Sequence, residues 1–202
     1  MFVNDMTMDL DTVPAADGDT DGSVSAAGSK LVLSPELWSA ETPNLYTMVL
    51  SLYDSKTGTY MGSVSQQLGF REIEFTKSEV DTNGNRTTTD SEYKPITING
   101  KQLLLKGTNR HDTDPEYGKY VPHETQEEDI KLMKQYNLNA LRTSHYSNDE
   151  YLYYLCDKYG ISLMAETNIE ANALMKDTIT AGSEAKKALF KKMCMDRTNT
   201  AY

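Results

Sequence analysis

The feature that most constrains the fold is an alternation of strand-like and helix-like segments in the second half of the chain. Short apolar runs bounded by turn residues predict strands, and apolar residues spaced by three or four predict helices. The expected order is strand 103–109, helix 125–137, strand 138–143, helix 148–159, strand 161–166 and helix 183–198. Such alternation requires a parallel sheet, because a helix must return the chain to the same end of the sheet.

Two parallel-sheet architectures fit this order: a doubly wound sheet and a (β/α)8 barrel. A doubly wound nucleotide-binding sheet carries a glycine-rich phosphate loop after a strand, and no such loop follows any expected strand. We therefore prefer a partial (β/α)8 barrel that contains the first three strand–helix units.

Local chemistry predicts where two of these helices begin and where one ends. Thr125 and Glu128 have the spacing of a capping box, in which each side chain bonds to the backbone amide of the other. Asn148 or Asp149 is expected to cap the second helix, and Gly160 to end it. An amphipathic helix between these two positions is therefore predicted.

The first half of the chain has a different pattern and divides into three segments. Residues 1–29 are rich in Asp and small residues, which predicts an acidic loop or a disordered segment. Residues 30–76 hold strand-like runs at 46–53 and 60–75, typical of the end of a β-sandwich, with the first strand half-buried. Residues 77–93 are polar and predict an insertion or a hairpin tip, so that the barrel occupies 94–202.

Composition excludes several classes of function. The formal net charge of −10 argues against a nucleic-acid partner, which requires clustered Lys and Arg. No apolar run is long enough for a membrane span, so no membrane partner is expected. Cys156 and Cys194 lack the spacing of a zinc or redox motif, and both are predicted to be buried thiols. The compartment stays unknown from these residues, with the cytoplasm slightly favoured.

Polar side chains follow each of the three expected barrel strands, at the end where a barrel carries its active site. They are Asn109, Arg110, His111 and Asp112, then Arg142, Ser144, His145 and Tyr146, then Glu166, Asn168, Glu170 and Asn172. A single histidine at such a position is more often structural than functional. Three polar clusters at successive strand ends instead predict one site rich in hydrogen-bond donors and acceptors, as a sugar requires.

Five short sequences resemble those of family 2 glycoside hydrolases in order and spacing. They are LWSAETPNLY at 37–46, LGFRE at 68–72, LKGTNRHD at 105–112, LRTSHY at 141–146 and ETNIE at 166–170. The resemblance covers most of the chain, about residues 31–202. It implies that an immunoglobulin-like β-sandwich ends within 30–76 and that a TIM-barrel catalytic domain begins near residue 94.

Within this family, the Asn-Ile-Glu string resembles β-galactosidases, which implies terminal β-D-galactosides such as lactose as substrates. The resemblance assigns His111, His145, Asn109 and Asn168 to substrate binding, and it implies a homo-oligomeric parent enzyme. β-Glucuronidase, another activity of the family, is the alternative.

The resemblance also matches Glu170 to a magnesium ligand, and carboxylate oxygens suit Mg²⁺. Asn172 stands where some relatives carry a histidine ligand, and Ala165 stands where an acidic residue is common. The alternative for Glu170 is a carboxylate paired with a neighbouring arginine such as Arg142.

The two catalytic carboxylates of the family are not found in the sequence. A retaining glycosidase needs an acid/base and a nucleophile about 5–5.5 Å apart, and in this family the acid/base follows an Asn. No Asn-Glu pair occurs in the 202 residues, so no catalytic residue is assigned and the chain alone is expected to be inactive. The alternative to an enzyme fragment is a non-catalytic carbohydrate-binding or complementing chain.

Overall fold

The computed structural model describes residues 28–29, 31–74, 79–80, 86–87, 95–170 and 182–201. The chain splits into two compact units, which are considered separately. The first lies within Met1–Glu36 and Tyr46–Leu68, and the second within Leu37–Leu45 and Gly69–Tyr202. The segment boundaries at residues 29, 76 and 93 stay predictions.

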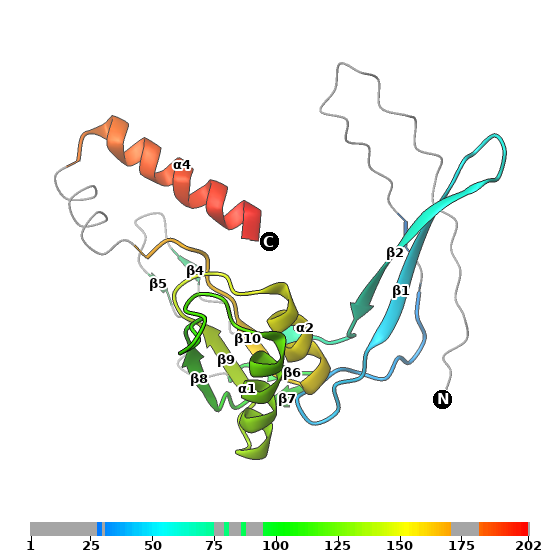
Figure 1. Ribbon diagram of the computed structural model, residues 1–202, viewed down its shortest axis with the longest axis horizontal. Helices are drawn as coiled ribbons and strands as arrows, with labels where there is room; N and C mark the ends of the chain where they lie inside the picture. Colours follow the sequence, from blue (N-terminus) through cyan, green and yellow to red (C-terminus); the bar gives the residue numbers. More distant parts are fainter. Residues whose placement is uncertain are drawn as a thin grey trace. The chain divides into compact units, whose positions relative to one another are not determined.

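The second unit is built on a parallel sheet of three strands (Figure 1). The strands are β8 (Gly107–Arg110), β9 (Ala140–Thr143) and β10 (Ser162–Met164), in the order β10–β9–β8. Each strand lies beside its predecessor in sequence, as a barrel requires. The predicted parallel sheet is confirmed, and in the described part of the chain it stays open and does not close into a barrel.

Helices α1 (His123–Gln135) and α2 (Glu150–Tyr159) pack against this sheet and against each other. Their shared core consists of Ile130, Met133, Leu141, Leu152, Leu155, Cys156 and Ile161, each at most 7% exposed. Burial at positions 152, 155 and 156 confirms the apolar face predicted for α2. Tyr136 lies at the C-cap of α1 and is 77% exposed.

The first barrel strand begins four residues later than predicted. Leu104 and Leu105 are 64% and 44% exposed, and neither lies in a strand. The Asn139 side chain replaces strand pairing here, because it accepts from the Lys106 amide at 2.7 Å and donates to the Leu104 carbonyl at 2.9 Å. Regular pairing therefore begins at Gly107, and Asn109 lies within β8 and not after it.

The capping box predicted for the first helix is wrong. Helix α1 begins at His123, two residues before Thr125, with Pro122 at the N-cap and no side-chain cap. The ring of Pro122 fixes φ at this position, and the helix starts directly after it without a side-chain cap. In α2 the Asp149 carboxylate accepts from the Tyr151 amide at 2.8 Å and Gly160 is left-handed, so both predicted ends are confirmed.

Trp38 attaches an early segment of the chain to the second unit. Its side chain is 1% exposed, its indole N–H donates to the Asp157 carbonyl at 2.8 Å, and the Arg71 guanidinium lies 4.8 Å from the ring centre. Two positions away, the Ala40 carbonyl accepts from Lys134 Nζ at 2.7 Å. Residues 37–45, predicted to belong to the sandwich, therefore pack on α1 and α2.

Two small antiparallel sheets complete the strands of the second unit. The strands β3 (Ile73–Glu74), β6 (Thr97–Ile98) and β7 (Lys101–Gln102) form one, and β4 (Glu79–Val80) pairs with β5 (Arg86–Thr87) in the other. A tight turn joins β6 to β7, with Asn99 and Gly100 both at positive φ.

Helix α4 (Glu184–Ala201) confirms the last predicted helix. Cys194, on this helix, is partly exposed, so the prediction that both thiols are buried holds only for Cys156. No helix in the described residues is long and apolar enough to cross a membrane.

In its described residues, the first unit contains one antiparallel pair, β1 (Tyr46–Tyr53) and β2 (Tyr60–Leu68). The Asp54 carboxylate accepts from the Thr57 and Lys56 amides in the turn, and these bonds lower its pKa. Met48, Leu50 and Leu52 are 51%, 51% and 58% exposed, so the predicted half-buried face is not covered by any described residue. The sandwich itself stays a prediction.

We predict that Gly107→Ala destabilises the second unit by about 2–3 kcal/mol, because its Cβ would lie 2.5 Å from the Ala140 carbonyl oxygen. Urea unfolding, followed by the fluorescence of Trp38, the only tryptophan, measures this change. Thr108→Ala, at an exposed position of the same strand, is the control and should change stability by less than about 0.5 kcal/mol. Equal effects of both variants would contradict the close approach of β8 and β9.

We also predict that only Cys194 reacts with a thiol reagent in the folded chain, and that both cysteines react after unfolding. Burial, the largest cause, raises the pKa of Cys156 to about 12. The unfolded thiol ionises near pH 8.5 while the folded one stays protonated, so this group's contribution to stability falls as pH rises above that value. Two fast-reacting thiols in the native chain would contradict the packing of α2.

Candidate functional site

His111 and His145 lie close together at the carboxyl ends of neighbouring strands. β8 ends at Arg110 and β9 at Thr143, and parallel pairing aligns these two residues. The two imidazole rings therefore meet, with centres 5.4 Å apart and planes at 72°. The sequence placed both histidines at strand ends, and the structure brings them into contact.

His145 lies among charged side chains from β9 and from the segment after β10. Its Nδ1 is 3.5 Å from Glu166 Oε2, 4.0 Å from Glu170 Oε2 and 3.5 Å from a guanidinium nitrogen of Arg142. Arg142 Nε donates to Glu166 Oε1 at 2.5 Å. Arg142 thus pairs with Glu166, not with Glu170, which was the sequence-based alternative. The peptide bond before His145 is cis.

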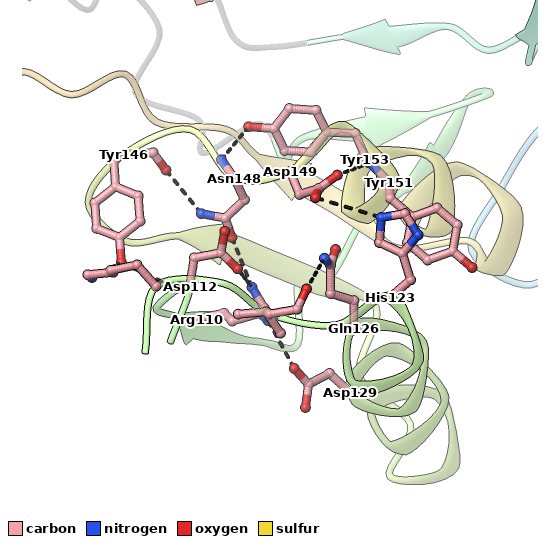
Figure 2. Close-up of polar contacts among 12 residues, drawn as sticks. Arg110, Asp112, His123, Gln126, Asp129, Tyr146, Asn148, Asp149, Tyr151 and Tyr153 are labelled. Carbon is pink, nitrogen blue, oxygen red and sulfur yellow. Dashed lines mark hydrogen bonds and ion pairs between the residues drawn. The ribbon is translucent and has the colours of Figure 1, made fainter. Parts of the chain in front are cut away.

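We call the strand ends that carry His111 and His145 the rim. Arg110 connects three segments beneath it (Figure 2). Its guanidinium donates to Asp112 at 2.7 Å, to Asp129 of α1 at 3.0 Å and to Asn148 at 3.2 Å, and the side chain is 10% exposed. Burial opposes its charge, but the hydrogen bonds to Asp112 and Asp129 outweigh burial and raise the pKa of Arg110. Arg110 is therefore a permanent cation that holds the end of β8.

Tyr146 joins the loop after β8 to the loop after β9. Its hydroxyl accepts from the Asp112 amide at 3.2 Å and from Lys119 Nζ at 2.9 Å. Its ring lies 6.2 Å from that of His111. The carbonyl of the same residue accepts from the Asn148 side chain at 3.3 Å, which links it to the Arg110 cluster (Figure 2).

The other predicted site residues are less closely grouped. Asn109 is exposed on β8, and Asn168 is exposed after β10, where its carbonyl accepts from Arg197. Glu170 is exposed and faces His145. Asn172 lies outside the described residues. Their roles in substrate binding stay predictions.

The described residues do not supply a complete magnesium site. No three His, Cys, Asp or Glu side chains in the described part of the chain are arranged to hold a metal ion. Glu170 alone offers a carboxylate at the predicted position. Magnesium binding therefore stays a prediction that the described geometry does not support.

Two features of the site were not assigned from the sequence. The Arg142–Glu166 pair was missed because Arg142 and Glu166 are 24 residues apart, although both had been placed at strand ends. The Arg110 cluster was missed because arginine at a strand end is common on surfaces. The only sequence signal for this cluster is the alternation of side chains along a strand. Arg110 directly follows Asn109, so the two side chains point to opposite faces of the sheet.

Comparison with known families gives two matches that together cover most of the chain. Residues 90–202 match the pattern described as glycosyl hydrolases family 2, TIM barrel domain. Residues 7–71 match a second pattern, described as glycosyl hydrolases family 2. The first match alone covers more than half of the chain and includes all three parallel strands.

Curated relatives carry the name β-galactosidase. The protein of Photobacterium profundum is 41% identical over 144 residues, which is 71% of this chain and 12% of the relative. That of Priestia megaterium is 38% identical over 175 residues, which is 85% of this chain and 15% of the relative. The chain thus spans about an eighth of the length of such relatives.

Similar solved structures carry other names. Bacteroides uniformis β-glucuronidase matches with a TM-score of 0.59 and 31% identity, over 72% of this chain and 16% of that chain. A β-glycosidase from Bacteroides vulgatus matches with a TM-score of 0.53 and 32% identity, over 66% of this chain and 15% of that one. The fold is thus shared with enzymes of more than one specificity.

We predict that Arg110→Met destabilises the second unit by about 2–3 kcal/mol, because three polar partners lose a charged donor in a largely buried position. Urea unfolding measures this effect. Lys131→Met is the matched control. It removes the ion pair that Lys131 forms with Glu127 on the surface of α1, and it should change stability far less. Equal losses would show that the Arg110 cluster is not a structural centre.

Proposed function

The chain belongs to glycoside hydrolase family 2, and we propose that it forms the galactose-facing part of a retaining β-galactosidase. The contact between His111 and His145 carries this proposal. The two rings lie at the carboxyl ends of neighbouring parallel strands, where a barrel binds its substrate. Two imidazoles can donate to and accept from sugar hydroxyls, and these bonds can strengthen in the transition state.

The surroundings of His145 define how it would act. The nearby carboxylates and guanidinium all approach Nδ1, so Nε2 is the nitrogen left for a ligand among the described residues. We propose the tautomer with a proton on Nδ1, which bonds to the Glu166 carboxylate and not to the Arg142 guanidinium, and this tautomer makes Nε2 a hydrogen-bond acceptor. His145 would then accept from a sugar hydroxyl while Glu166, held by Arg142, fixes the ring.

The charge of the rim favours a neutral sugar over a glucuronide. Glu166 is already paired with Arg142, and Glu170 adds a second carboxylate beside His145. The guanidinium of Arg110 is bound to Asp112 and Asp129. A sugar carboxylate would therefore lie near these carboxylates, and both Arg142 and Arg110 are already paired. The curated relatives named β-galactosidase support the same choice.

β-Glucuronidase remains the second candidate because solved structures of that name share the fold. Their identity to this chain is 26% and 31%, below the 38–41% of the β-galactosidases cited above. We therefore place β-glucuronidase second.

Hydrolysis needs the carboxylate pair of the family in addition to these residues. No Asn-Glu pair occurs in the 202 residues, so we propose that this chain contacts the sugar without cutting the glycosidic bond by itself.

Two chimeras test the proposal. In one, residues 31–170 replace the matching segment of the Priestia megaterium β-galactosidase; in the other, they replace that of the Bacteroides uniformis β-glucuronidase. We expect turnover of a chromogenic β-galactoside by the first chimera and little turnover of a β-glucuronide by the second. In the first, His111→Ala or His145→Ala should lower kcat/KM by about 10- to 100-fold, since each removes a hydrogen bond to the sugar.

His123→Ala is the matched control, because His123 is the third histidine and lies outside the rim, 56% exposed and stacked on Tyr151. Its kcat/KM should stay within about twofold of the parent chimera. A folded first chimera in which all three histidine variants behave alike would contradict the proposal. Activity in the glucuronidase chimera alone would favour the second candidate.

A further inference from the structure

The loop between β8 and α1 exposes two aromatic side chains beside the rim. Tyr117 and Tyr120 are 56% and 65% exposed, although large aromatic rings gain most from burial. Their rings form an edge-to-face pair with centres 6.2 Å apart. The loop therefore presents two faces of aromatic surface to solvent.

This loop is held in one conformation by its own hydrogen bonds. The backbones of Asp114 and Gly118 bond to each other in both directions, at 2.7 and 3.0 Å. The Asp114 side chain accepts from the amides of Glu116 and Tyr117 at 2.8 and 2.9 Å. Gly118 supplies the positive φ of 70° that this turn requires. A ligand that binds the tyrosines would lose little loop entropy.

The loop is also fixed to the histidine rim. Lys119, between the two tyrosines, donates to the Tyr146 hydroxyl at 2.9 Å, and its ammonium lies 4.8 Å from the centre of that ring. The Tyr146 ring lies 6.2 Å from His111, which in turn contacts His145. These contacts join Lys119, which lies between the two exposed tyrosines in the sequence, to the candidate sugar site.

We propose that Tyr117 and Tyr120 form a platform for the second sugar ring of a β-galactoside, next to the galactose bound at the rim. One face of a pyranose ring carries C–H groups that pack on an aromatic ring, and the phenol hydroxyls can bond to sugar hydroxyls. This inference rests on the proposed function for the identity of the first sugar. It assigns recognition of the second sugar, which is the leaving group in hydrolysis, to the loop after β8.

A purely structural role for the pair accounts for less of the geometry. The loop is already fixed by Asp114, Gly118 and Lys119, without either tyrosine ring. Rings that served only to stabilise the loop would be expected to lie against it, whereas both are more than half exposed. The two hypotheses differ in what loss of a ring should do to binding of a disaccharide.

The test is an NMR titration of the full 202-residue chain with labelled Tyr and His rings, using lactose and methyl β-galactoside. Lactose should shift the ring signals of Tyr117 and Tyr120, whereas methyl β-galactoside should shift only those of His111 and His145. Tyr117→Ala and Tyr120→Ala should each raise the Kd of lactose about fivefold to tenfold and leave that of methyl β-galactoside unchanged.

Tyr117→Phe and Tyr120→Phe keep the ring and should retain most of the affinity for lactose. Tyr136→Ala is the matched control, because this tyrosine is 77% exposed at the far end of α1. Absence of lactose-induced shifts at both tyrosines, or equal lactose affinity in the alanine variants, would overturn the platform. Shifts at the tyrosines without shifts at the histidines would contradict the proposed function, and with it the assignment of the platform to the second sugar ring, whereas shifts at the histidines alone would overturn only the platform.

Discussion

Parallel pairing of β8 and β9 is the constraint on which the rest of the site depends. The register joins Asn109 to Arg142 and Arg110 to Thr143, so the two strands end level with each other. Histidines that are 34 positions apart in the sequence are thereby placed in ring contact. The pairing in turn requires Gly107, because Ala140 leaves no space for a side chain there. A residue without any side chain thus determines where two imidazoles meet.

A second requirement is that polar contacts hold the loops that follow these strands. Arg110 does so from inside, through two carboxylates and one amide that belong to different segments. Tyr146 does so at the rim, by joining Asp112 and Lys119. A charged group with 10% exposure is stable only because its partners satisfy it. The polar network that positions the site therefore has a largely buried guanidinium at its centre.

The order of elements could be predicted from the sequence because apolar spacing is local information. Gly160 ended its helix as predicted, since a left-handed residue at that position strongly favours glycine. The start of β8 could not be predicted, because the side chain of Asn139 satisfies the Leu104 and Lys106 backbone across 33 to 35 positions of sequence. The Trp38 contact with the Asp157 carbonyl was likewise invisible, since it joins groups 119 positions apart.

The candidate site shows the same division between local and long-range information. Strand ends placed His111 and His145 on one rim, and their chemistry suggested a sugar before any distance was known. The sequence did not show which carboxylate pairs with Arg142, because this depends on the geometry of β9 and β10. The structure shows that the partner is Glu166. The carboxylate of Glu170 lies on the same nitrogen of His145, at 4.0 Å. The charges that surround His145 are thus set by a pairing that the linear sequence does not reveal.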